Sequence, residues 1–232
     1  MNQSEKVARF RLKNRNNKKW YSGAFHLFFN GTCLVTISLF SFFQISDLQI
    51  IELILIPIML IIGNLVVYLV HRYPLHKKYR YIHNGSYGQH TLWHHRFYTN
   101  ENYQVVKKED FQTLFFPPVV IVLFSLFFIP GLYFFLNLFL PNNLVFLTLG
   151  MSSIYFILYE TLHYTSHLPE KHWALRIPHL KKMHQQKNSI LFYIACPKGG
   201  IYIIIQQDQI YLNGGITKLF IKKKAGILTT QK

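Results

Sequence analysis

Histidine is the residue type that offers the most chemistry in this chain. Eleven of its twelve histidines fall into two windows, residues 71–95 and 163–184, and only His26 lies elsewhere. The two cysteines, Cys33 and Cys196, are far apart in the sequence. Neither a disulfide framework nor a cysteine-based zinc site is therefore expected. A metal site in this protein must be built from imidazoles.

The spacing within each window favours ion binding. His90 and His94 are four residues apart, as are His163 and His167. On a helix, each pair projects from one face and could hold one ion. Glu160 lies on the same helical stripe as the second pair, where it could bind an ion, orient a ligand or simply cap the helix.

His71 and His76 are five residues apart, which a straight helix would spread to different faces. Pro74 lies between them, and we expect it to break the helix so that the two rings converge. Neutral imidazole binds Fe, Zn, Cu and Ni, and a pKa near 6.5 makes the neutral form available at pH 7. A lone histidine is more often a hydrogen-bonded or interfacial side chain, which is our interpretation of His26, His83 and His172.

Apolar segments must position these histidines. Half of the residues are hydrophobic, 17% are aromatic and only 15% are charged, and the mean hydropathy is +0.16. This composition excludes disorder and a conventional water-soluble surface. Four apolar stretches, at residues 24–45, 49–70, 112–136 and 142–163, are each near the roughly 20 residues that cross a bilayer. Pro117 and Pro118 predict a kink in the third stretch.

Basic residues flank these stretches, and the formal net charge is +16. No Lys or Arg occurs in residues 20–71 or 109–170, which include the connections at 46–49 and 130–143. The positive-inside rule then places both termini, the central loop and the histidine windows on the cytoplasmic side. Orientation and attraction to anionic lipid explain the charge better than nucleic-acid binding. The sequence thus predicts an all-α integral membrane protein, with about four transmembrane helices in two hairpins and a cytoplasmic histidine-rich cap.

Taken together, the histidine motifs resemble a known family. The motifs are His71-xxxx-His76, His90-xxx-His94-His95, Tyr159-Glu160-xx-His163-xxx-His167 and Leu180-Lys-Lys-Met-His184. Their order, spacing and position relative to the apolar stretches, over residues 50–197, resemble the histidine boxes of the fatty acid hydroxylase and sterol desaturase superfamily. The resemblance implies a non-haem di-iron centre, with O2 as co-substrate, that hydroxylates or desaturates an aliphatic C–H of a lipid. The implied ligands are His71, His76, His90, His94, His95, His163, His167 and His184, with His179 or Glu160 as substitutes.

Oxidation of this kind also needs a lipid substrate from the bilayer and two external electrons. The chain has no dinucleotide-binding glycine motif, haem motif or cysteine cluster. We therefore expect a separate electron donor, such as a cytochrome b5-like protein, a ferredoxin or a reductase, to dock on the basic cytoplasmic face.

The last motif departs from the family pattern. The family reads His-x-x-His-His, whereas here Lys187 and Asn188 follow His184-Gln-Gln. Either these two residues replace the histidine pair, or a short deletion has removed it. A frame slip near residue 186, or a degenerating copy, would explain both this difference and the unfamiliar tail. We assign residues 1–197 to one membrane domain, with a basic segment at 1–20, and 198–232 to an atypical tail. Two alternatives stay open beside an active oxygenase: an inactive or single-metal relative that keeps the fold, and a histidine-based membrane metal carrier.

Overall fold

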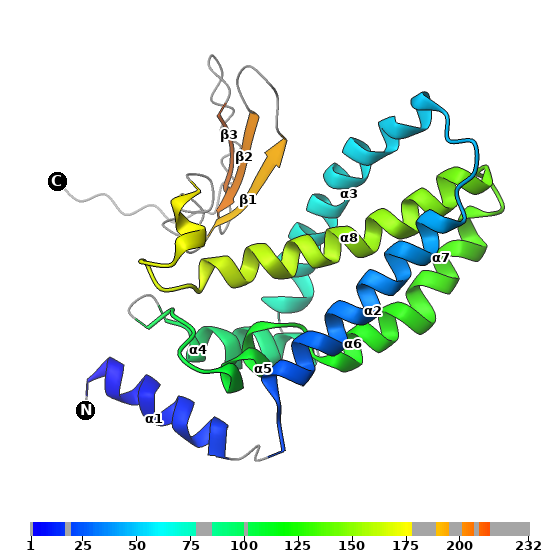
Figure 1. The fold of residues 1–232 in the computed structure, drawn as a ribbon. Helices are drawn as coiled ribbons and strands as arrows, with labels where there is room; N and C mark the ends of the chain where they lie inside the picture. The colour runs from blue at the N-terminus through cyan, green and yellow to red at the C-terminus, as the bar shows by residue number, and fades with distance from the viewer. Residues whose placement is uncertain are drawn as a thin grey trace. The chain divides into compact units, whose positions relative to one another are not determined.

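A computed structural model of the chain describes residues 2–16, 20–77, 85–99, 102–177, 189–194, 201–206 and 209–213 (Figure 1). These residues belong to two compact units, Met1–Gln185 and Gln186–Lys232. The first unit contains the apolar helices and every histidine that the structure describes. It is the unit in which a histidine site can form.

Four helical segments of the first unit are long and apolar enough to cross a membrane, as predicted. They are Gly23–Phe43, Ile50–Leu75, Pro118–Leu136 and Asn142–Ser166. The first is α2 and the last is α8. The second consists of η1 (Ile50–Ile54), α3 (Leu55–Val70) and the π turn η2 (His71–Leu75), and the third of α6 (Pro118–Leu123), the π segment η5 (Phe124–Phe128) and α7 (Ile129–Leu136).

Two of the predicted boundaries are wrong, and proline explains both. The third span begins at Pro118 rather than near residue 112, because Phe115 and Pro117 are extended and separate it from the short helix α5 (Phe111–Leu114). The second span runs past residue 70 to Leu75, and Pro74 lies inside η2. Instead of breaking the helix, the backbone widens into a π turn, a distortion that often marks functional sites.

α8 is the central helix of the bundle. It packs against α2, α3 and α7, and α2 also packs against α6 (Figure 1). Half of the most apolar stretch of α8 is buried, whereas only 6% of the corresponding stretch is buried in the second and third spans. Large side chains such as Phe28, Leu65 and Phe127 are exposed on the outer helices. Such apolar outer faces are expected of helices in contact with lipid.

Glycines allow the helices to approach α8 closely. A Cβ atom on Gly63 of α3 would lie 2.6 Å from the ring of Tyr155, and one on Gly150 would lie 2.8 Å from the ring of Phe42. The hydroxyl of Tyr155 donates to Oδ1 of Asn64 at 2.5 Å. Small residues and interhelical hydrogen bonds are the usual means of packing membrane helices.

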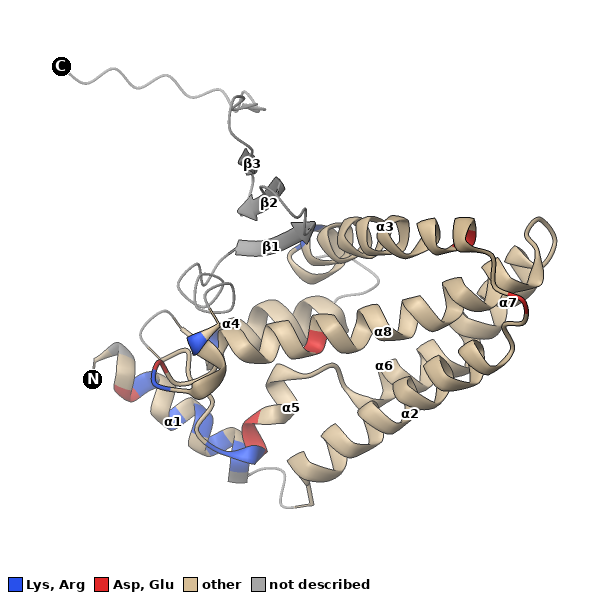
Figure 2. Ribbon diagram, turned by 45° about the horizontal axis from the view of Figure 1, so that its top comes forward, with Lys and Arg blue, Asp and Glu red and all other residues tan. Residues whose placement is uncertain are grey.

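Charged residues are separated along the first unit. Basic residues lie on α1 (Gln3–Asn16) and around α4 (His95–Phe97). At the opposite end, where residues 44–49 connect α2 to the second span, every charged residue that the structure describes is acidic (Figure 2). At that end, Asn143 Nδ2 donates to the Ser46 carbonyl at 2.8 Å and to the Glu52 carboxylate at 3.1 Å.

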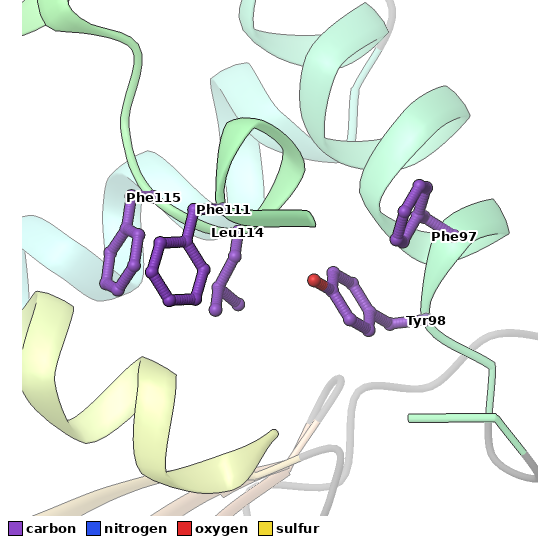
Figure 3. Close-up of a cluster of buried hydrophobic side chains, with 5 residues drawn as sticks. All are labelled: Phe97, Tyr98, Phe111, Leu114 and Phe115. Atoms are coloured by element: carbon purple, nitrogen blue, oxygen red, sulfur yellow. The ribbon is translucent and has the colours of Figure 1, made fainter. Parts of the chain in front are cut away.

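An aromatic cluster joins the short helices at the basic end. Phe97 and Tyr98 face Phe111, Leu114 and Phe115 (Figure 3). All five side chains are buried. The cluster fixes α5 against the end of α4, which matters because both helices carry groups of the histidine site.

The second unit contains three antiparallel strands: β1 (Ser189–Ile194), β2 (Ile201–Gln206) and β3 (Gln209–Asn213). They form a sheet in the order β1-β2-β3, in which Ile190 pairs with Ile205 and Ile205 with Ile210. The sequence analysis assigned no element to this region. The described residues of the first unit contain no strand, in agreement with the all-α prediction.

The glycine contacts give a stability prediction. Gly63→Ala should lower the melting temperature in detergent, because the new methyl group displaces Tyr155 and an overpacked site typically costs about 1–3 kcal/mol. Gly31→Ala is the control, since nothing lies within 4 Å of its added Cβ. Equal melting temperatures for the Gly63→Ala and Gly31→Ala proteins would contradict the close packing of α3 on α8.

Candidate metal centre

Seven histidines form two groups in which the potential ligand atoms converge. His71, His76, His90 and His95 make a four-histidine group, and His94, His163 and His167 make a three-histidine group. Within each group, one nitrogen from every ring lies within 4.8 Å of the others. Three separate parts of the chain contribute: the end of the second span, residues 90–95, and the end of α8.

In the four-histidine group, the Nε2 atoms lie almost in contact. Nε2 of His71 is 3.4 Å from Nε2 of His76 and 3.1 Å from Nε2 of His90. Nε2 of His95 is 3.4 Å from Nε2 of His76. Two nitrogens that share an ion, each at about 2.1 Å, lie about 3.0–3.4 Å apart for right-angle to tetrahedral geometry. The observed separations match that range.

Hydrogen bonds alone cannot satisfy these contacts. The contacts form a chain from His90 through His71 and His76 to His95. In a neutral imidazole, Nε2 is either a donor with one proton or an acceptor. Any assignment of protons therefore satisfies at most two of the three contacts. A shared cation accepts all four lone pairs, so the residues fit a metal ion better than they fit one another.

Local backbone structure brings these four rings together. His71 begins the π turn η2 and His76 follows it directly, while His90 lies in a second π segment, η3 (Gly88–His94). Two hydroxyls join the segments: Ser86 Oγ donates to the Pro74 carbonyl at 2.9 Å, and Thr91 Oγ1 donates to the Leu75 carbonyl at 2.6 Å. Carbonyls at a helix end lack intrahelical partners, so these bonds both cap η2 and fix η3 beside it.

The three-histidine group is more deeply buried. His94 is 6% exposed and His167 is 9% exposed. The ring centroids of His94 and His163 are 4.9 Å apart, and each lies 5.2 Å from that of His167. His163 and His167 lie four residues apart on or just beyond the last turn of α8, as the spacing predicted.

Backbone carbonyls set the tautomers of two of these rings. Nδ1 of His94 is 2.9 Å from the Thr113 carbonyl, and Nδ1 of His167 is 2.7 Å from the Tyr103 carbonyl. A carbonyl only accepts, so each Nδ1 must carry the proton and donate it. In the neutral ring, Nε2 then carries the lone pair that binds a metal. This arrangement is common around histidine ligands.

Burial keeps the imidazoles neutral. It lowers the pKa of His90 and that of His94, and neighbouring histidines lower both pKa values further. Neutral rings have the lone pairs that a metal needs and need not lose a proton to bind it.

One expectation about pairing is wrong. His90 and His94, although four residues apart, belong to different groups, with His90 beside His71 and His94 beside His163. Their rings stack with centroids 5.1 Å apart. The two groups are therefore neighbours, joined by consecutive turns of the segment 90–95.

The remaining candidates have other partners or lie outside the described residues. The Glu160 carboxylate accepts the Phe116 N–H at 3.3 and 3.4 Å and is not a member of either group. His26 bonds the Phe116 carbonyl and the Tyr21 hydroxyl, at 2.8 and 2.6 Å. These hydrogen bonds agree with a structural role for Glu160 and for His26. His83, His179, His184, Lys187 and Asn188 lie outside the described residues.

Sequence reasoning missed the groups that orient two of the imidazoles and pack against them. The Tyr103 and Thr113 carbonyls leave no side-chain signal in a sequence. Tyr98, whose ring centroid lies 4.3 Å from that of His167 and 5.1 Å from that of His94, was also missed. Its position, four residues after His94, was the only available signal.

Comparison with known proteins gives no relative from which a function could be inferred. No protein-family model, curated protein or solved structure matches the chain. The function must be argued from the geometry of the two histidine groups.

The grouping predicts which ion each histidine holds. His71→Ala and His163→Ala should each remove about one metal ion per chain, and the double variant should remove both, because the two residues belong to different groups. Elemental analysis of purified protein measures the ratio. His172→Ala is the control, since Nδ1 of His172 accepts the Ala174 N–H at 3.2 Å and the residue belongs to neither group. Equal losses of metal in His71→Ala, His163→Ala and His172→Ala would contradict the assignment.

Proposed function

We propose that this chain is a membrane-bound oxygenase with a two-metal centre, which uses O2 and external electrons to hydroxylate or desaturate a lipid. The observation that carries the proposal is the convergence of seven imidazoles into two adjacent groups at one end of four apolar helices. The resemblance of the histidine motifs to the fatty acid hydroxylase and sterol desaturase superfamily supports it. That resemblance favours iron.

The donor set limits which ions the site would hold. The ligand atoms in both groups are imidazole nitrogens, without thiolate or carboxylate from the described residues. Such a set suits Fe, Zn, Cu or Ni and is a poor choice for Mg or Ca. Bound iron would supply the oxidant for an unactivated C–H bond, which no amino-acid side chain can provide.

The protein contributes ligation, orientation and exclusion of water. The Tyr103 and Thr113 carbonyls hold two imidazoles in one tautomer, and burial keeps His94 and His167 from bulk water. The apolar faces of the spans give an acyl chain or sterol access from the bilayer. In hydroxylation, the C–H bond is replaced by C–O with one atom of O2, while two electrons and two protons reduce the other atom to water.

Electrons must come from another protein. Lys6, Arg9, Lys13 and Arg96 are exposed on α1 and α4, at the end of the unit that carries the histidines. An acidic redox protein would be attracted to this face. The positive-inside rule places it, with both termini and the metal centre, in the cytoplasm.

The single-metal or inactive relative is a second candidate. It is favoured by Lys187 and Asn188, which stand where the family has two histidines, and by the three-histidine group, which has one ligand fewer than its neighbour. A metal carrier is less well supported. It would need polar groups along the spans, but Asn64 is bonded to Tyr155, and Ser38 to a backbone carbonyl at 2.9 Å.

Lipid analysis tests the oxygenase. Cells that make the chain under ¹⁸O2 should contain a lipid with one ¹⁸O atom, or one that has lost two hydrogens. His94→Ala and His76→Ala should each lower the amount of product at least tenfold, whereas His172→Ala should leave it unchanged. Anaerobic cells should make none.

Other outcomes assign the alternatives. Metal-loaded protein with unchanged lipids would indicate the inactive relative, and altered cellular metal content with unchanged lipids would indicate a carrier. If the chain holds only one ion, as the single-metal alternative predicts, Lys187→His with Asn188→His should raise the metal content toward two ions per chain; unchanged content would point to a deletion or a different ligand set.

A further inference from the structure

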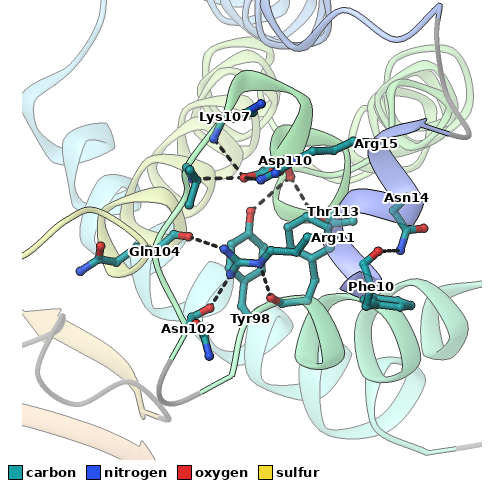
Figure 4. Close-up of polar contacts among 12 residues, drawn as sticks. Phe10, Arg11, Asn14, Arg15, Tyr98, Asn102, Gln104, Lys107, Asp110 and Thr113 are labelled. Carbon is teal, nitrogen blue, oxygen red and sulfur yellow. Dashed lines mark hydrogen bonds and ion pairs between the residues drawn. The ribbon is translucent and has the colours of Figure 1, made fainter. Parts of the chain in front are cut away.

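Helix α1 is attached to the histidine site by one buried guanidinium. Arg11 is 7% exposed, although it lies in a strongly basic helix. Its Nε donates to the Phe97 carbonyl at 2.9 Å and its Nη1 to the Gln104 carbonyl at 3.1 Å, while Nη2 donates to the Asn102 carbonyl (Figure 4). One side chain thus binds three backbone carbonyls of the segment 97–104.

That segment begins just after one ligand and bonds another. Phe97 follows His94 by three residues, and the Tyr103 carbonyl accepts the Nδ1 proton of His167 at 2.7 Å. The Val105 N–H donates to the His167 carbonyl at 2.9 Å. Arg11 therefore holds the backbone on both sides of Tyr103, through the Asn102 and Gln104 carbonyls, and residue 167 itself holds the next residue, Val105.

A second arginine on the same face of α1 reaches the other carbonyl that sets a tautomer. Nε and Nη2 of Arg15 donate to the two oxygens of Asp110, at 2.7 and 2.8 Å. The Asp110 carboxylate, which is fully buried, also accepts the Val106 and Lys107 N–H groups, and its backbone carbonyl accepts the Thr113 hydroxyl at 2.8 Å (Figure 4). The Thr113 carbonyl in turn accepts from His94.

We propose that Arg11 is a positioning residue for the three-histidine group, acting through the Tyr103 carbonyl that orients His167. Resting on the proposed function, the inference extends it: α1, outside the membrane spans, is part of the metal centre. The three carbonyls are bonded by three different nitrogens of one planar guanidinium, whereas a lysine ammonium carries its three donors on a single nitrogen and cannot reproduce this spacing. Loss of groups that orient histidine ligands typically costs 10–100-fold in metal affinity.

The test isolates the three-histidine group. In a His71→Ala/His95→Ala background, Co²⁺ binding to the full chain in detergent is followed by titration and by its visible absorption spectrum. Arg11→Gln and Arg11→Lys should each weaken Co²⁺ binding at least tenfold and change the spectrum. Arg9→Gln, on the exposed face of α1, should match the background protein.

A further control separates positioning from stability. Leu34→Ala creates a cavity in α2, where the side chain is 2% exposed, and should lower the melting temperature without weakening Co²⁺ binding. If Arg11→Gln binds Co²⁺ as tightly as Arg9→Gln, or loses no more affinity than Leu34→Ala, the positioning role is overturned. If the background protein binds no Co²⁺ at all, the metal site of the proposed function fails and this inference fails with it.

Discussion

Lone-pair repulsion between neutral imidazoles is the constraint that governs the first unit. Four Nε2 atoms come within 3.1–3.4 Å of a neighbour, and protons can satisfy only part of these contacts. Placing such a cluster beside apolar spans is unfavourable unless a cation lies among the nitrogens. The hydroxyl bonds from Ser86 and Thr91 to the carbonyls of the π turn hold these rings together against the repulsion.

Helix ends, rather than loops, determine where the two histidine groups lie relative to the apolar spans. The second span ends at Leu75, one residue before His76, and α8 ends at Ser166, one residue before His167, so the length of each span determines where these rings lie. In the proposed oxygenase, a site at the end of the spans would meet lipid on one side and water-soluble proteins on the other. That location suits the oxidation of a bilayer substrate with electrons from a soluble donor.

Much of this arrangement could be predicted from the sequence, since hydropathy and charge report on spans directly. Helical periodicity predicted that His163 and His167 lie together, and the structure brings both into one group. The partners of His90 could not be predicted, because residues 88–94 form a π segment and α-helical geometry does not apply there. The carbonyl contacts of Arg11 could not be predicted either, because a lysine- and arginine-rich sequence is the same whether its cations face lipid headgroups or backbone carbonyls.

The two histidine groups differ in the sequence separation of the residues that they bring together. The four-histidine group draws on residues 71–95, whereas the three-histidine group joins residue 94 to residues 163 and 167 across two further spans. Short closures lose less chain entropy and form sooner than long ones. During synthesis, the four-histidine group can therefore form before the third and fourth spans are made, whereas the three-histidine group must wait for α8.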